Sequence, residues 1–313
     1  MISNAFTGMI MSVTGPLPAG EMGFTLPHEH VMSTFGADPA RYPAYETDQV
    51  LAVVLPYLEK VKNLGCQTLI DCTAAYFGRH PELLRRISLT SGMHILTNTG
   101  YYAAAGDRYV PEHARIETAE QIAARWVHEF QDGIDETGVH PGFIKTAVDD
   151  NGFSELDCKL VRAACLTHRQ TGLVIQTHTG GNLEAVQGIL AGLKETCLSP
   201  SAWIWVHAHN VVEASHLISV AHQGVWISLD GISSASAAHI LDLLLSLKKE
   251  GLLSQVLLSH DGDSYCAGSF RPYEYLMSDF LAILAQSGFT HQEVRQLTVE
   301  NPQRAFTIQP RLI

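Results

Sequence analysis

The feature that most constrains the fold is a regular alternation of short β-rich runs with longer segments whose apolar residues have helical spacing. The β-rich runs lie at residues 23–26, 67–70, 94–97, 142–145, 173–176, 203–206, 225–228 and 255–258. The helical spacing is clearest at 47–64, 118–136, 155–170 and 237–249. Strands that alternate with helices of this length are typical of parallel βαβ units.

Eight such units predict a closed (β/α)8 TIM barrel, which needs about 250 residues plus insertions. The alternative, a doubly wound open sheet, lacks its usual Gly-x-Gly-x-x-Gly after the first strand. No linker or internal repeat divides the chain, so we expect one domain over residues 1–313. Residues 1–22 are interpreted as an N-terminal β-hairpin, with turn signals at Pro16 and Gly20. Residues 292–306 should form a last helix, interrupted at Asn301-Pro302.

The composition narrows the possible partners. Apolar residues make up 46% of the chain, which is enough for a large core, and the net charge of −12 disfavours binding to nucleic acid. No apolar run approaches the ~18 residues of a membrane span. The first basic residue is Arg41, and the six cysteines form no Cys-x-x-Cys pair. We therefore expect a cytoplasmic protein that acts on a small molecule, with neither nucleic acid nor membrane as partner.

Potential metal ligands follow five of the predicted strands, at the end of the barrel where active sites lie. They are His28 and His30 after the first strand, Lys145 within the fourth, His178 at the end of the fifth, His207 and His209 after the sixth, and His260 and Asp261 after the eighth. This distribution, more than any single residue, indicates a metal site.

His28 and His30 are two residues apart on a strand, so both side chains should point the same way. Such a pair by itself is more typical of a polar loop, but the matching residues at four other strand ends favour metal binding. Glu29 should point away and has no expected metal role. His207 and His209 share a face, so the pattern leaves the choice of ligand between them open.

Lys145 lies in an otherwise apolar strand, where a buried ammonium is costly. It could be exposed at the strand end, or form a Schiff base with a pKa depressed by burial. A third alternative is carboxylation by CO2, which converts the cation to a carbamate whose two oxygens can bridge two divalent ions. Asp261 is suited both to bind one ion and to accept a proton.

Residues 23–30, Gly-Phe-Thr-Leu-Pro-His-Glu-His, resemble the opening signature of the phosphotriesterase family within the amidohydrolase superfamily. The resemblance continues in order through Lys145, His178, His207 and Asp261. It implies a (β/α)8 barrel with two divalent ions, usually Zn2+, with Mn2+ or Co2+ as alternatives, and often a homodimer.

The same resemblance implies a division of the ligands. His28, His30 and Asp261 would bind the more buried ion, and His178 and His207 the exposed one. Lys145, carrying the CO2-derived carbamate, would bridge both ions. A hydroxide between the ions would then be the nucleophile.

Three features bear on the substrate. Tyr102 matches a position where lactonases of the family carry a site tyrosine, although it could equally be an aromatic wall residue. His209 and Asn210 stand where the family often has an acidic residue. Gly231 stands where phosphotriesterases have histidine and many lactonases arginine. The proton relay of phosphotriesterases should therefore be absent, and we expect a small polar carboxylic ester or lactone as substrate.

Further residues have weaker expected roles. Arg271 could bind a substrate carboxylate or phosphate, or cap the next helix. His209 and His260 are candidate substrate contacts that add polarity at the barrel mouth, or they could simply hydrogen-bond to the backbone. The alternative functions are hydrolysis of a phosphorus ester or an acyl-amide at the same site, a non-catalytic binding protein, and a Schiff-base aldolase that uses Lys145.

Overall fold

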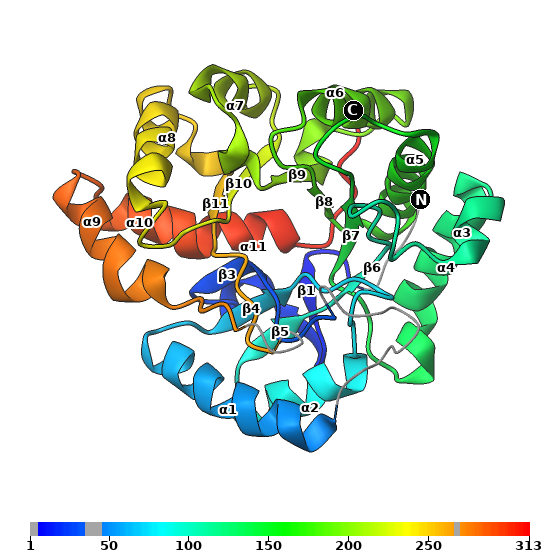
Figure 1. Ribbon diagram of the computed structural model, residues 1–313, viewed down its shortest axis with the longest axis horizontal. Coiled ribbons are helices and arrows are strands. Elements are labelled where there is room, and N and C mark those ends of the chain that lie inside the picture. The colour runs from blue at the N-terminus through cyan, green and yellow to red at the C-terminus, as the bar shows by residue number, and fades with distance from the viewer. Residues whose placement is uncertain (1–5, 35–45, 266–269) are drawn as a thin grey trace.

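The computed structural model describes residues 6–34, 46–265 and 270–313. Its strands form a central ring with helices around the outside (Figure 1). The strands of the ring are β3 Thr25–Glu29, β4 Thr68–Asp71, β5 His94–Leu96, β6 Asn98–Thr99, β7 Phe143–Ala147, β8 Ile175–His178, β9 Trp203–Val206, β10 Trp226–Leu229 and β11 Val256–Leu258.

All neighbouring pairs within the ring are parallel. Strands β5 and β6 are one predicted strand broken at Thr97, whose carbonyl still accepts a hydrogen bond from the Gly142 N–H at 2.8 Å. The ring closes beyond β11, where the Asp261 N–H donates to the His28 carbonyl at 3.2 Å and the His30 N–H to the Gly262 carbonyl at 2.8 Å. The predicted (β/α)8 barrel is confirmed.

The outer helices follow the strands in sequence. They are α1 Thr47–Asn63, α2 Pro81–Ser91, α3 Glu112–Ile116, α4 Ala119–Asp132, α5 Glu155–Thr171, α6 Leu183–Glu195, α7 Ala214–Ala221, α8 Ala237–Lys249, α9 Leu281–Gln286, α10 His291–Arg295 and α11 Asn301–Phe306. Among the described residues, no helix combines the length and apolar character needed to cross a membrane.

Local signals account for where the helices begin and end. Thr118 and Ser154 each form a capping box at the start of α4 and α5, which satisfies backbone N–H groups that have no partner within the helix. Helix α4 ends at Asp132, earlier than the predicted residue 136, because Gly133 follows with a φ of 96° that a helix cannot adopt. The last predicted helix is α10 and α11 joined by a π-helical turn at Gln296–Glu300.

The N-terminal hairpin is present, but its turn is not where the sequence placed it. Strands β1 Met9–Ser12 and β2 Gly15–Pro18 pair antiparallel, with Ser12 opposite Gly15. The turn is therefore Val13-Thr14, and the predicted turn residue Pro16 lies within β2. The Ser12 hydroxyl stabilises this tight turn by donating to the Gly15 carbonyl at 2.7 Å.

The alternation of side chains along each strand separates the barrel interior from the helix layer. In β7, Phe143 belongs to the interior apolar cluster, whereas Ile144 packs in the cluster beneath the helices. The interior cluster fills the amino-terminal half of the barrel and includes Leu96, Phe143, Val174, Ile204, Leu257 and Phe306. This apolar floor places Lys145, two residues beyond Phe143, inside the barrel on the side of the carboxyl ends.

Candidate metal centre and active site

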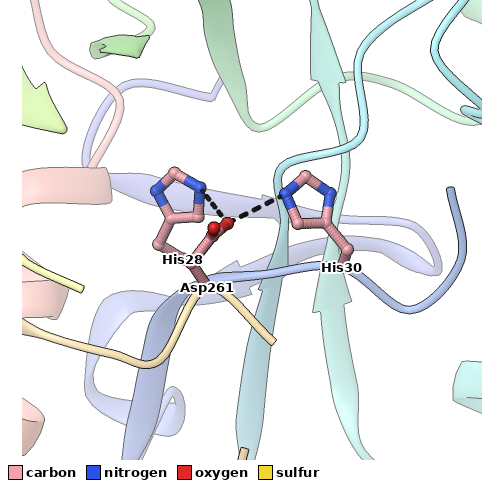
Figure 2. Close-up of side chains that lie close together, drawn as sticks. All are labelled: His28, His30 and Asp261. Atoms are coloured by element: carbon pink, nitrogen blue, oxygen red, sulfur yellow. Dashed lines mark ion pairs between the residues drawn. The ribbon is translucent and has the colours of Figure 1, made fainter. Parts of the chain in front are cut away.

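Two histidines and an aspartate meet at the carboxyl end of the barrel (Figure 2). The Nε2 atoms of His28 and His30 each lie 3.3 Å from Oδ1 of Asp261. Donor atoms about 2.0–2.2 Å from one tetrahedral ion lie roughly 3.3–3.5 Å from each other, so this spacing suits a shared ion. The three side chains form a group able to hold a metal.

Thr73 sets the orientation of the His30 ring. Its hydroxyl donates to the Met32 carbonyl at 2.8 Å and lies 2.8 Å from Nδ1 of His30. Because the hydroxyl hydrogen is used, the oxygen accepts the proton of Nδ1. The lone pair of His30 is therefore on Nε2, which faces Asp261. A partner of this kind on the far nitrogen is typical of histidines that bind metals.

Lys145 has an unusual environment for a lysine. Only 1% of its surface is exposed, and its Nζ makes no hydrogen bond within the described part of the chain. Burial lowers the pKa of this amine, although the negative charges of Asp261 and Asp230 oppose the shift. A lowered pKa favours the neutral amine, the form that reacts with CO2. The orphaned Nζ thus fits a lysine that gains two oxygens and metal partners.

His178 and His207 lie face to edge beside this lysine, with ring centroids 4.4 Å apart. Burial, reinforced by the nearby His207 and Lys145, holds the pKa of His178 well below its usual range, so its ring is neutral and can act as a ligand. The Tyr102 hydroxyl lies 3.3 Å from Nδ1 of His178. The Tyr102 ring stacks on Phe77 at 4.7 Å, which fixes its position.

The backbone at the strand ends brings two of these side chains into the mouth. His207 has a φ of 57° and Asp261 a φ of 55°, both in the left-handed region that residues with a side chain rarely adopt. Such strain is typical of functional sites. At His207 it breaks the alternation that follows the inward-facing Val206, and the imidazole turns toward His178.

The comparisons with known proteins agree with this geometry. The model of the phosphotriesterase family matches residues 8–306. The chain is 27% identical over 291 residues to the phosphotriesterase homology protein of Escherichia coli K12, covering 91% of this chain and 98% of the relative. It is 24% identical over 314 residues to an aryldialkylphosphatase of Saccharolobus solfataricus, covering 92% and 96%.

The chain belongs to the phosphotriesterase family. The solved organophosphorus hydrolase of Deinococcus radiodurans has the same fold, with a TM-score of 0.85 at 27% identity, and the match covers 98% of this chain and 99% of that one. These likenesses confirm the resemblance noted in the sequence and make the chain a hydrolase.

Asp230 also belongs to this site, although no role was predicted for it from the sequence. It is fully buried, and its carboxylate accepts hydrogen bonds from the backbone N–H of His207 at 3.1 Å, from Nδ1 of His207 at 2.8 Å and from the Ser228 hydroxyl at 2.8 Å. Oδ2, the oxygen that accepts from Ser228, also lies 3.1 Å from Nδ1 of His28, as an ion-pair contact without hydrogen-bond geometry. Although burial raises the pKa of a carboxyl, the neighbouring His207 and His28 hold that of Asp230 well below its usual range.

His207, His209 and Asp230 also form a group that could hold an ion. A hydrogen bond just described already pairs two members of this group, because Asp230 accepts the ring proton of His207. The Asp230 carboxylate therefore orients His207 by hydrogen bonds and also faces Nδ1 of His28. A signal was available in the sequence, since Asp230 follows the seventh strand, for which no ligand had been assigned.

Replacing Asp230 with Asn should weaken metal binding about 10- to 100-fold. The amide has one acceptor oxygen where the carboxylate has two, and His207 and Ser228 use both carboxylate oxygens. Chelator competition measures the affinity, with Asp242→Asn on the exposed face of α8 as the control. An affinity equal to that of the control would contradict the positioning role.

Both ring nitrogens of His260 have protein partners, which matches the alternative that this histidine hydrogen-bonds within the protein. Nδ1 lies 2.7 Å from Oε1 of Glu29, and Nε2 accepts the Leu276 N–H at 2.9 Å. Strand β11 ends at Leu258, and beyond it the left-handed Asp261, not His260, faces His28 and His30. Glu29 points away from the site as expected, and it anchors the end of β11 by accepting hydrogen bonds from Ser259 and Gly262 as well.

Arg271 lies on the loop after β11, where its backbone pairs with Asp263. Its guanidinium is 4.0 Å from the buried Asp263 carboxylate, and 39% of the side chain is exposed. The structure thus places Arg271 beside an acidic partner, Asp263. Residues 266–269, which precede Arg271 in the same loop, lie outside the described residues.

Proposed function

We propose that this protein is a hydrolase with two divalent ions, most simply Zn2+, that acts on small polar carboxylic esters or lactones. The observation that carries the proposal is the buried, unpartnered Nζ of Lys145 between histidines and aspartates at the barrel mouth. An uncompensated lysine there is costly, whereas a carbamate neutralised by cations is not. A non-catalytic binding protein has no need of this arrangement.

The residues divide into two sets that share Lys145. His28, His30 and Asp261 would hold one ion, and His178 and His207 the other, with the carboxylated Lys145 contributing to both. When bound, such ions polarise an ester oxygen and lower the pKa of water to near neutrality. The histidines are oriented for this task by Thr73 and Asp230.

Asp261 and Tyr102 perform the proton and hydrogen-bond chemistry in this proposal. Burial raises the pKa of a carboxyl, but His207, His28 and His30 hold that of Asp261 well below its usual range, so it is ionised and can accept the proton of the attacking water. Burial raises the pKa of Tyr102, so its phenol stays protonated and can donate a hydrogen bond near the leaving oxygen.

Two features bear on whether the substrate is a carboxylic ester or a phosphorus ester. Gly231 supplies no side chain where the phosphotriesterases have histidine, which supports a carboxylic ester or lactone. Likeness to an aryldialkylphosphatase and an organophosphorus hydrolase supports a second candidate, hydrolysis of phosphorus esters at the same site.

A substrate panel tests the proposal. Protein reconstituted with Zn2+, Mn2+ or Co2+ in bicarbonate would be assayed on small lactones, carboxylic esters, phosphotriesters, phosphonate esters and acyl-amides, with metal-free protein as control. We expect the highest kcat/KM for a small lactone or ester, and no turnover without metal. A higher value for a phosphorus ester would favour the second candidate, and no turnover of any compound would contradict both.

A further inference from the structure

Strand β3 contains one extra residue beside the proposed metal ligands. Between Leu26 and Glu29, three steps along β3 match only two steps along the neighbouring strand β4. Leu26 packs beneath the helices, and strict alternation would turn the His28 side chain the same way. The extra residue is a β-bulge that reverses the alternation, so that His28 and His30 point into the barrel mouth.

The bulge takes the peptide group between Pro27 and His28 out of the register with β4, and two side chains hold this peptide instead. Its carbonyl accepts a hydrogen bond from Nε2 of Gln176 at 3.0 Å, and its N–H donates to Oγ of Ser259 at 3.0 Å. Gln176 lies on β8 and Ser259 directly follows β11. The backbone that carries His28 is therefore fixed from two other strands of the barrel.

The amide of Gln176 is itself held in one orientation. Its side chain is 1% exposed and points into the barrel like that of Val174, two residues earlier on β8. A carbonyl only accepts hydrogen bonds, so the NH2 group must face Pro27 and Oε1 must face the other way. There Oε1 lies 3.3 Å from the Cys72 thiol, a weak donor. Hydrogen bonds thus join β4, β8 and β3 one layer below the metal ligands.

We propose that Gln176 is a positioning residue of the metal centre, which fixes the direction of the His28 imidazole by holding the Pro27–His28 peptide from inside the barrel. The inference rests on the proposed function and adds a residue that acts only through the backbone. Rotation of this peptide would carry the His28 ring away from Asp261, because the ring is attached to the adjoining Cα. Loss of a partner that orients a metal ligand typically lowers metal affinity about 10- to 100-fold.

Amide hydrogen exchange in the metal-free protein tests the first step without any ion. Gln176→Met removes the donor with a side chain of similar length that suits the apolar interior, so the barrel should remain folded. The His28 N–H should then exchange about fivefold faster, as expected when one hydrogen bond is lost. The Gly142 N–H, which donates to the Thr97 carbonyl, should keep its rate. The control Gln187→Met, at an exposed site on α6, should change neither rate.

Zinc affinity tests whether this contact serves the metal centre. Chelator competition should give an affinity about tenfold lower for Gln176→Met than for the wild type. Ser259→Ala removes the partner at the other end of the same peptide and should also lower the affinity. Because both residues hold one peptide, the loss in the double variant should be smaller than the product of the two separate losses.

Several results would overturn the inference. They are an unchanged His28 exchange rate in Gln176→Met, equal acceleration at His28 and Gly142, which would indicate a general loss of stability, and an unchanged zinc affinity beside a faster His28 amide. Fully multiplicative losses in the double variant would also overturn it. If the wild type binds no zinc, the proposed function fails, and the exchange rates still decide whether Gln176 holds the peptide. If the wild type and Gln176→Met bind zinc equally, only this inference fails.

Discussion

Replacing Lys145 with methionine should lower kcat/KM by at least about a thousandfold, because metal ions supply several kcal/mol of transition-state stabilisation and methionine offers no anionic bridge to hold them. The methionine fits the apolar surroundings, so the barrel should remain folded. Turnover and metal content measured on the same preparation check the prediction. Lys249→Met, on the exposed face of α8, is the matched control and should match the wild type.

A rescue experiment strengthens the test of Lys145. In Lys145→Ala, bicarbonate or acetate could occupy the vacated space and replace the carbamate oxygens, so part of the activity should return with added anion. Near-normal turnover of Lys145→Met would show that the lysine is not a bridge. Trapping of a substrate adduct on Lys145 with borohydride would instead indicate Schiff-base chemistry.

Replacing Asp261 with Asn should lower kcat by about 10²–10⁴-fold, the usual loss when a proton acceptor is removed. Asparagine keeps an oxygen near Nε2 of His28 and His30 but does not take up a proton, so turnover should fall more than metal content. The acidic limb of the wild-type pH profile should change in the variant. Because the carboxylate and the metal site titrate together, that limb belongs to the pair and not to Asp261 alone.

Near-normal turnover of Asp261→Asn with its metal retained would contradict the role of Asp261 and require another route for the proton. His209 would then be the residue to test, since its side chain is 14% exposed and lies beside Asp230. His260 no longer qualifies, because Glu29 and the Leu276 N–H occupy its two nitrogens.

Strand periodicity explains which parts of the site could be predicted from sequence. Phe143 and Lys145 share the inward face of β7, and His28 and His30 converge because they are two residues apart. The barrel was predictable for a similar reason, since the repeated strand and helix units have few ways to bury their apolar faces. The hairpin turn was misplaced because Pro16 is tolerated within β2, in a two-stranded sheet with open edges.

Strand periodicity no longer predicts which way a side chain points once the backbone leaves the extended conformation. The left-handed φ of His207 is why alternation could not decide between His207 and His209, and no residue type at that position signals it. The role of Asp230 was hidden for another reason. It depends on contacts with residues 23 and 202 positions away in sequence, which appear only when the barrel closes.

The most direct test of the central claim is anomalous diffraction from crystals of the zinc-reconstituted protein grown with bicarbonate. The proposal predicts two zinc peaks per chain about 3.5–4 Å apart. One should lie among His28, His30 and Asp261, the other between His178 and His207, and density beyond Nζ of Lys145 should bridge them. A single peak, no peak, or two ions flanking an unmodified lysine would contradict the proposed binuclear centre.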